Sequence, residues 1–300
     1  MERAGIIVVS VVAAACLWGC RKTPAGPVPE QTSPAAWGVE LVKVVAGMDV
    51  PECALYDHER RQVYVSNIST SNKGYWVEDG KGFLSVLSPE GVTKKLRWVD
   101  STDAMPIHAP KGLGILDGYL YFADVTALKR VAISGGEVET IALPEAKRLN
   151  DVAADGEAIW VSDVELSKIY RVDMEGKVRE IPAPEHVNGV TCHDGKMYAV
   201  SWFHHDVYEV DPAGEKEPVA FGLADHFTNL DGIEVLDDGT FLVSDFTGGK
   251  VCTIAADRRT VNTLVELETP ADIGLDRANG LLYVPQLKLD KVVIFRLRKE

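Results

Sequence analysis

The sequence has few cysteines and few basic residues, and its N-terminal apolar run is too short to cross a membrane. Five cysteines in 300 residues exclude a disulfide-rich scaffold. Lys and Arg number 31 against 45 Asp and Glu, for a net charge of -14. A chain this acidic repels phosphate backbones, so no nucleic-acid partner is expected. With 46% hydrophobic and 25% charged residues, the composition is that of a folded protein rather than a disordered or collagen-like one.

The N-terminus has the pattern of an export signal. Arg3 precedes an apolar run of thirteen residues, Ile6 to Trp18, which suits the hydrophobic region of a signal peptide. The segment Leu17 to Cys20 resembles a bacterial lipobox, although Trp18 stands where a small residue is usual. This resemblance implies a signal peptide over residues 1–19 and acylation of Cys20. A plain secretory signal cleaved nearby is the alternative.

A proline-rich stretch follows Cys20. Prolines at positions 24, 27, 29 and 34 exclude a helix or a central strand, so residues 20–36 are predicted to be a tether. The folded part is predicted to span residues 37–300. The expected location is the bacterial cell envelope, on the periplasmic or outer face, with the lipid as the sole membrane contact and a monomer as the expected state.

Beyond the tether, one short motif recurs at intervals of about forty residues. It consists of a polar residue, a small or acidic residue and the start of an apolar strand. Its first positions are Glu52, Lys111, Asn150, Asn188 and Asp231, and in the last unit Ala271, followed by the acidic Asp272. A second strand begins about ten residues after each motif, and third and fourth strands close most units. The pattern predicts an all-β fold, a six-bladed β-propeller with four-stranded blades.

The ends of the chain are predicted to meet in one blade. The last unit has three strands, and the segment from Val39 to Val45 is available to supply the fourth. Such closure removes open sheet edges. The first unit carries an insertion, Asn67 to Gly82, with Tyr75 and Trp76 at its centre. It is interpreted as a contact patch, a lid over the channel or a packed surface loop.

In a propeller, the first strand of each blade lines the central channel, so the motif residues should ring one mouth. Carboxylate and amide oxygens from separate blades would converge there, and hard divalent cations prefer such ligands. The sequence contains no His and Cys pairs at zinc spacing. Two alternatives remain: Asn or Asp before Gly can shape a turn, and Lys111 can neutralise Glu52. An outer ring at the second-strand ends, including Asp124, Asp163 and Asp245, is expected to be structural.

At these residues the chain resembles the six-bladed gluconolactonase and regucalcin-like (senescence marker protein) family, over roughly Val39 to Leu297. The resemblance implies a divalent-metal site at the channel mouth, with Glu52, Asn188 and Asp231 as ligands. Calcium is the expected ion, with magnesium, manganese or zinc as alternatives. It also implies that Asp231 is the general base. The Arg-x-Asn-Asp stretch at Arg148 implies that Arg148 and Asn150 bind substrate.

The resemblance is weakest around Glu52, where the family's Gly-Pro and Trp are replaced by Cys53, Ala54 and Leu55. The expected function is metal-dependent hydrolysis of a lactone or similar small ester. A non-catalytic propeller that binds a ligand or docks a protein is the alternative. The remaining cysteines, Cys53, Cys192 and Cys252, are expected to be buried small hydrophobes, although Cys53 adjoins a predicted ligand.

The lipobox interpretation predicts that Cys20→Ser blocks processing or releases the protein from membranes, because the acyl chain is the only expected anchor. Membrane fractionation and mass spectrometry of the mature N-terminus check this. An unlipidated wild-type N-terminus, together with unchanged fractionation of the variant, would contradict it.

Overall fold

The computed structural model describes Met1, residues 37–70 and residues 74–299. The predicted signal peptide, Cys20 and the tether lie outside the described residues. Within the described part, no helix is long and apolar enough to cross a membrane.

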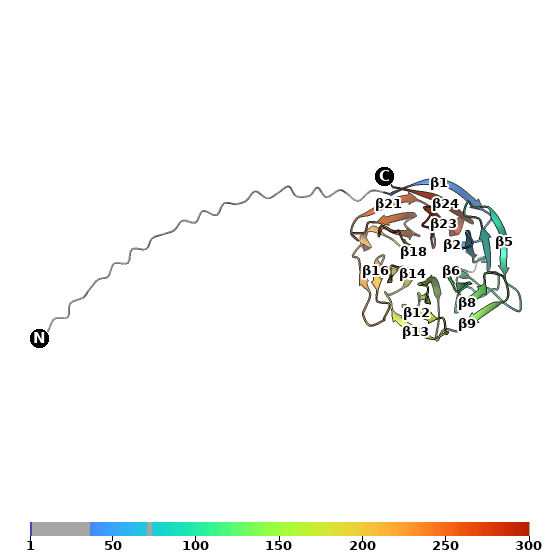
Figure 1. Ribbon diagram of the computed structural model, residues 1–300, viewed down its shortest axis with the longest axis horizontal. Helices are drawn as coiled ribbons and strands as arrows, with labels where there is room; N and C mark the ends of the chain where they lie inside the picture. Colours follow the sequence, from blue (N-terminus) through green and yellow to red (C-terminus); the bar gives the residue numbers. More distant parts are fainter. Residues whose placement is uncertain (2–36, 71–73, 300) are drawn as a thin grey trace. The chain divides into compact units, whose positions relative to one another are not determined.

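The chain from Trp37 onward folds into six antiparallel four-stranded sheets arranged in a ring, a six-bladed β-propeller (Figure 1). Blade 1 contains β2 (Pro51–Asp57), β3 (Gln62–Asn67), β4 (Phe83–Leu87) and β5 (Thr93–Asp100). Blade 2 contains β6 (Pro110–Leu116), β7 (Tyr119–Asp124), β8 (Ala127–Ala132) and β9 (Val138–Ile141). Blade 3 contains β10 (Leu149–Ala154), β11 (Ala158–Asp163), β12 (Lys168–Asp173) and β13 (Val178–Pro182).

Blade 4 contains β14 (Val187–His193), β15 (Lys196–Ser201), β16 (Val207–Val210) and β17 (Val219–Ala220). Blade 5 contains β18 (Leu230–Val235), β19 (Phe241–Asp245), β20 (Lys250–Ile254) and β21 (Val261–Glu266). Blade 6 contains β22 (Gly274–Asp276), β23 (Leu281–Gln286), β24 (Lys291–Lys299) and β1 (Trp37–Ala46). Two short 3-10 helices, η1 (Ala224–His226) and η2 (Leu287–Leu289), complete the described elements. The predicted fold class is confirmed.

The ring is closed by the two ends of the chain, as the sequence predicts. The N-terminal strand β1 pairs antiparallel with the C-terminal strand β24, from Trp37 opposite Lys299 to Ala46 opposite Lys291. Blade 6 therefore takes three strands from one end of the chain and its outermost strand from the other (Figure 1). This pairing satisfies the backbone groups of an edge that would otherwise be open.

The hydrophobic core lies between the blades. Each pair of neighbouring blades encloses one cluster of buried side chains, so the inner and middle strands are covered on both faces. Between blades 1 and 2, for example, Tyr64 and Leu84 pack against Leu120 and Phe122. This packing explains why the second strands are apolar at consecutive positions, rather than alternating with polar residues.

The inner strands approach one another closely around the channel, and glycine in or next to the motif permits this. A Cβ atom on Gly189 of β14 would lie 2.1 Å from the carbonyl oxygen of Asp231 on β18. On Gly274 of β22 it would lie 1.8 Å from the carbonyl oxygen of Ala54 on β2. Both contacts are with backbone atoms, which cannot move aside without separating the blades. Neither residue has a positive φ, so it is the close approach that requires glycine.

We expect Gly189→Ala to destabilise the propeller by about 1–3 kcal/mol, because the added methyl group forces β14 and β18 apart. Denaturant unfolding checks this. Lys196→Ala, at an exposed position on the neighbouring strand β15, is the matched control and should leave stability unchanged. Equal stability of Gly189→Ala and wild type would contradict the close-approach argument.

Candidate functional site

In blades 1 to 5, the motif residues lie in β-bulges at the start of the inner strands. The register between the first and second strands shifts across Glu52–Cys53 in blade 1 and across Asn188–Gly189 in blade 4. The same shift occurs in blades 2, 3 and 5. A bulge inserts extra backbone into one strand and re-aims its side chains. The alternative that Asn188-Gly189 and Asp231-Gly232 form turns is wrong, because both pairs lie within strands.

Serines on the second strands hold these bulges in place. The Ser66 hydroxyl accepts a hydrogen bond from the backbone N–H of Cys53 at 2.9 Å, and Ser162 accepts from Asp151 at 2.9 Å. In blade 5, Ser244 accepts from Gly232 at 2.7 Å. Each bond satisfies an N–H that the shifted register leaves unpaired. The side chains of the motif are therefore held on a rigid backbone.

Glu52 and Lys111 form a buried ion pair at one mouth of the channel. Lys111 Nζ lies 3.6 Å from Glu52 Oε1, and both residues are 3% exposed. The other carboxylate oxygen, Oε2, is buried and has no hydrogen-bond partner. Loss of solvation raises the pKa of Glu52 to about 8, although Lys111 opposes this effect. One ammonium group therefore does not fully compensate this carboxylate.

A chain of amides connects the next three blades at the same mouth. The Asn150 amide donates to the side-chain oxygen of Asn188. The Asn188 amide in turn donates to Asp231 Oδ1 at 3.0 Å and to the carbonyl oxygen of Leu230 at 3.2 Å. Burial raises the pKa of Asp231 to about 7, while Lys111 lowers it. The structure thus links Asn150, Asn188 and Asp231 directly, and Lys111 acts electrostatically on both Glu52 and Asp231.

A second layer of acidic side chains lies one residue deeper, of which the sequence indicated Asp272 but not Asp151. The second motif position is Gly in blades 2, 4 and 5, but Cys53, Asp151 and Asp272 in blades 1, 3 and 6. A Cβ atom on Gly112 would lie 2.3 Å from Asp151 Oδ1, so this glycine makes room for the carboxylate. Gly occupies this position in three units and a larger residue in the other three, and this difference could have indicated the second layer from the sequence.

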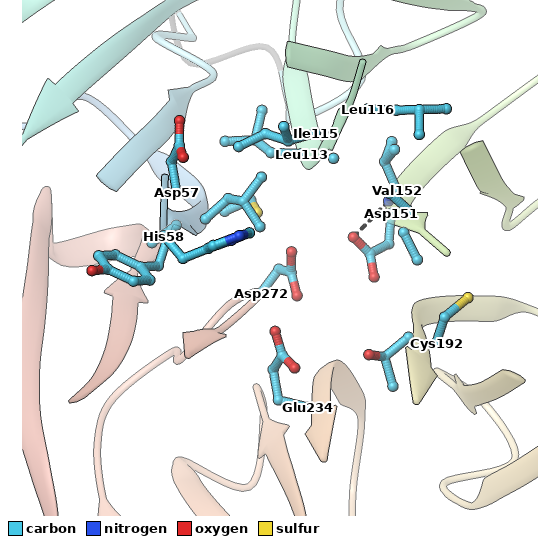
Figure 2. Close-up of a pocket in the computed structure, with 18 of the residues that line it drawn as sticks. Asp57, His58, Leu113, Ile115, Leu116, Asp151, Val152, Cys192, Glu234 and Asp272 are labelled. Carbon is cyan, nitrogen blue, oxygen red and sulfur yellow. Dashed lines mark hydrogen bonds between the residues drawn. The ribbon is translucent and has the colours of Figure 1, made fainter. Parts of the chain in front are cut away.

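Asp151 and Asp272 project into the channel from blades 3 and 6 (Figure 2). Asp151 accepts hydrogen bonds from the N–H groups of Val152 and Val190, each at 2.6 Å. Burial raises the pKa of Asp151 to about 6, and burial with the nearby carboxylates raises the pKa of Asp272 well above its usual value. Burial also raises the pKa of the Cys53 thiol, which argues against a reactive thiolate.

The described part of the insertion after β3 reaches the mouth that holds Glu52 through Trp76. The Trp76 ring lies 4.3 Å from Lys111 Nζ and 5.8 Å from the Arg148 guanidinium carbon. Glu78 accepts a hydrogen bond from Thr126 of blade 2 at 3.1 Å. Of the three interpretations of the insertion, these contacts favour a cover over the channel. They also place Arg148 at the rim, where it pairs with Glu165 at 3.3 Å and its side chain is 52% exposed.

The outer ring is structural, as expected. Asp124 accepts hydrogen bonds from the N–H groups of His108 and Ala109. Asp163 and Asp245 bind the equivalent N–H groups in blades 3 and 5. These carboxylates anchor the segment that leads into each inner strand. Among the described residues, no group of three or more His, Cys, Asp or Glu side chains is placed to hold a metal ion.

No family model and no curated protein matches this sequence. Similar solved structures include a protein assigned as a gluconolactonase, with 18% identity, a TM-score of 0.65, and coverage of 89% of this chain and 94% of that one. A luciferin-regenerating enzyme is 17% identical, with a TM-score of 0.61 and coverage of 85% and 94%. Virginiamycin B lyase from Staphylococcus aureus is 13% identical, with a TM-score of 0.58 and coverage of 87% and 99%. At these identities the similarity shows the fold alone.

We expect the metal-free protein to lose stability as pH rises from about 5 to 8. Burial raises the pKa of Glu52 from 4.5 to about 8 and that of Asp231 from 3.8 to about 7. The folded state therefore retains protons that the unfolded state has released, so this contribution is full at low pH and declines through that range. Melting temperatures measured in chelator check the prediction.

Glu52→Gln tests the role of Glu52. Its melting temperature should fall less steeply between pH 5 and 8 than that of wild type, because the glutamine side chain does not titrate. Glu175→Gln, at an exposed position, should follow the wild-type curve. Parallel curves for Glu52→Gln and wild type would show that Glu52 does not cause the pH dependence.

Proposed function

We propose that this protein hydrolyses a lactone or similar small ester at the mouth that holds Glu52, with the help of one divalent cation. The observation that carries the proposal is the buried, unpartnered Oε2 of Glu52, in a ring that also contains the buried carboxylate of Asp231. Two desolvated carboxyl groups share a single ammonium group, so ionisation of both would leave excess negative charge. A bound cation would relieve it.

The donor set is compatible with calcium. Glu52, Asp231 and the side-chain oxygen of Asn188 offer hard oxygen ligands from three blades. The Asn188 oxygen now accepts from Asn150, so ligation would require that amide to rearrange. When bound, the cation would polarise the ester carbonyl and stabilise negative charge on its oxygen. The similarity to a gluconolactonase-like propeller supports a hydrolase but does not define its substrate.

The remaining roles follow from the position of each side chain. Asp231, whose pKa is raised to about 7, suits a general base that removes a proton from water near neutral pH. Asn150 and Arg148 lie beside the same mouth and would bind hydroxyl or carbonyl groups of the substrate. Trp76 would cover the substrate and limit access of bulk water.

One observation favours a non-catalytic scaffold instead. Lys111 is itself a cation, buried and 3.6 Å from Glu52, and it could take the place of a metal. In that case the mouth would be a structural ion-pair cluster, and the surface around Trp76 would bind a ligand or a protein.

Calcium titration of Glu52→Gln, Asp231→Asn and Lys111→Met separates these functions. If calcium binds, each carboxylate variant should lose at least tenfold in affinity, because both carboxylates serve one site. Lys111→Met should bind calcium more tightly, because it removes a competing positive charge. Calcium should also raise the melting temperature of the proteins that bind it. Arg171→Met, which removes a partly exposed cation on an outer part of blade 3, is the control.

Activity is tested with a panel of lactones, with and without chelator. Arg148→Ala should retain calcium affinity and lose most lactone hydrolysis, because its proposed role is to hold substrate. If wild type binds no calcium and Lys111→Met gains none, the metal site is wrong and the scaffold is favoured. If calcium binds but no lactone is turned over, the proposed reaction fails while the metal site stands.

We also propose that the protein is anchored in a bacterial cell envelope through Cys20. The sequence from Leu17 to Cys20 and the proline-rich segment that follows support this proposal.

A further inference from the structure

A cavity opens at the opposite end of the channel from Glu52, where the inner strands end. Its volume is about 710 Å³, and residues from all six blades line it. This volume lies within the range of small-molecule sites in proteins, roughly 300–1,000 Å³. The cavity is separate from the mouth described above, because its lining begins at Cys53, Asp151 and Asp272 and continues away from Glu52.

The walls of the cavity carry apolar side chains among polar ones. Leu55, Ile115, Val152, Ile233 and Ile273 contribute from five different blades. Leu55 and Ile115 are only partly buried, so their side chains present apolar surface to the cavity. Figure 2 shows Ile115 and Val152 around the same space as the acidic groups. Such walls favour the hydrocarbon part of a ligand, because burial of apolar surface is favourable.

The inner end of the cavity is acidic. Asp151 and Asp272 are 6% and 7% exposed and point into the space (Figure 2). Glu234 also points toward it, from blade 5. Asp272 interacts with the other carboxyl group, Asp151, and with the Cys53 thiol, neither of which supplies positive charge.

The basic side chains that line the cavity are already paired. Arg277 contacts Glu234 at 2.7 Å, and Arg60 contacts Asp57 at 3.3 Å. Among the described lining residues, Asp151 and Asp272 therefore have no lysine or arginine partner. A buried carboxylate without a cation is unfavourable unless a proton or a ligand compensates it. The net charge of -14 would also favour the approach of a positively charged ligand.

We propose that this cavity binds an organic ammonium ion. Its ammonium group meets Asp272 and Asp151 at the inner end, and its hydrocarbon body contacts the walls formed by Leu55, Ile115 and Ile233. A carboxylate ligand is disfavoured by the acidic inner end. A neutral ligand could not form an ion pair with the two aspartates. The proposal does not depend on the proposed hydrolase function, because it concerns the other end of the channel.

Isothermal titration of the full-length protein in detergent tests the proposal with three probes that share one ring. These are cyclohexylamine hydrochloride, cyclohexanol and sodium cyclohexanecarboxylate, each also titrated into detergent alone. Wild type should bind cyclohexylammonium at least tenfold more tightly than cyclohexanol, and the carboxylate more weakly than either. Absence of cyclohexylammonium binding, or equal affinity for the alcohol, would overturn the proposal.

Two kinds of variant locate the binding. Ile115→Trp fills the cavity and should weaken cyclohexylammonium binding at least tenfold. Asp272→Asn should weaken it to the level of cyclohexanol and leave cyclohexanol unchanged. Asp194→Asn removes an acid that is 87% exposed in the turn between β14 and β15, and should bind as wild type does.

Circular dichroism and thermal melting check folding, and Leu55→Trp replaces Ile115→Trp if the latter is unfolded. Wild-type affinity in the cavity-filling variant would place the amine elsewhere and reject the site.

Discussion

The close approach of the inner strands around the channel is the constraint on which the rest of this structure depends. At Gly189 and Gly274, a Cβ atom would collide with a carbonyl oxygen of the neighbouring blade. Larger side chains fit at the second motif position only where the adjacent strand leaves room, as Gly112 does for Asp151. Glycine therefore has two roles here. It allows six blades to close into a ring, and it creates the space in which buried carboxylates accumulate.

The bulges then determine the direction of the functional side chains. The inner strands of blades 1 to 5 carry a register shift at the motif, and serines of the second strands satisfy displaced N–H groups in blades 1, 3 and 5. Because these bonds are buried, the backbone below Glu52 and Asp231 is rigid. The result is a set of amide groups beside acids whose pKa values are raised by burial, and such raised values are typical of functional sites and also of structural ion clusters.

The two ends of the channel differ in chemistry although the same six strands form both. At the starts of these strands the ring is polar, with Lys111 as its cation and Trp76 above it. At their ends apolar side chains such as Leu55 and Ile115 form part of the wall, and Asp151 and Asp272, which have no lysine or arginine partner among the lining residues, lie at the inner limit. This difference arises because the bulge turns polar side chains inward at the start of each strand, whereas the regular part of each strand carries apolar residues for packing between blades. The solved structures of similar shape share the blades and not the residues, since their identities to this chain lie between 12% and 19%.

The forty-residue period, the alternation within each unit and the surplus N-terminal strand were enough to predict the propeller and its closure through β1 and β24. These features follow from local periodicity and from the need to pair every strand edge, and both can be read along the chain. The sequence also indicated which polar residues would ring one mouth. It offered the pairing of Lys111 with Glu52 and a lid at Trp76 only as alternatives, which the contacts in the structure favour, and it did not reveal that Asp151 faces Asp272 across the channel. Asp151 and Asp272 belong to blades 3 and 6, which are far apart in the sequence, and only the closure of the six blades into a ring brings the two side chains together.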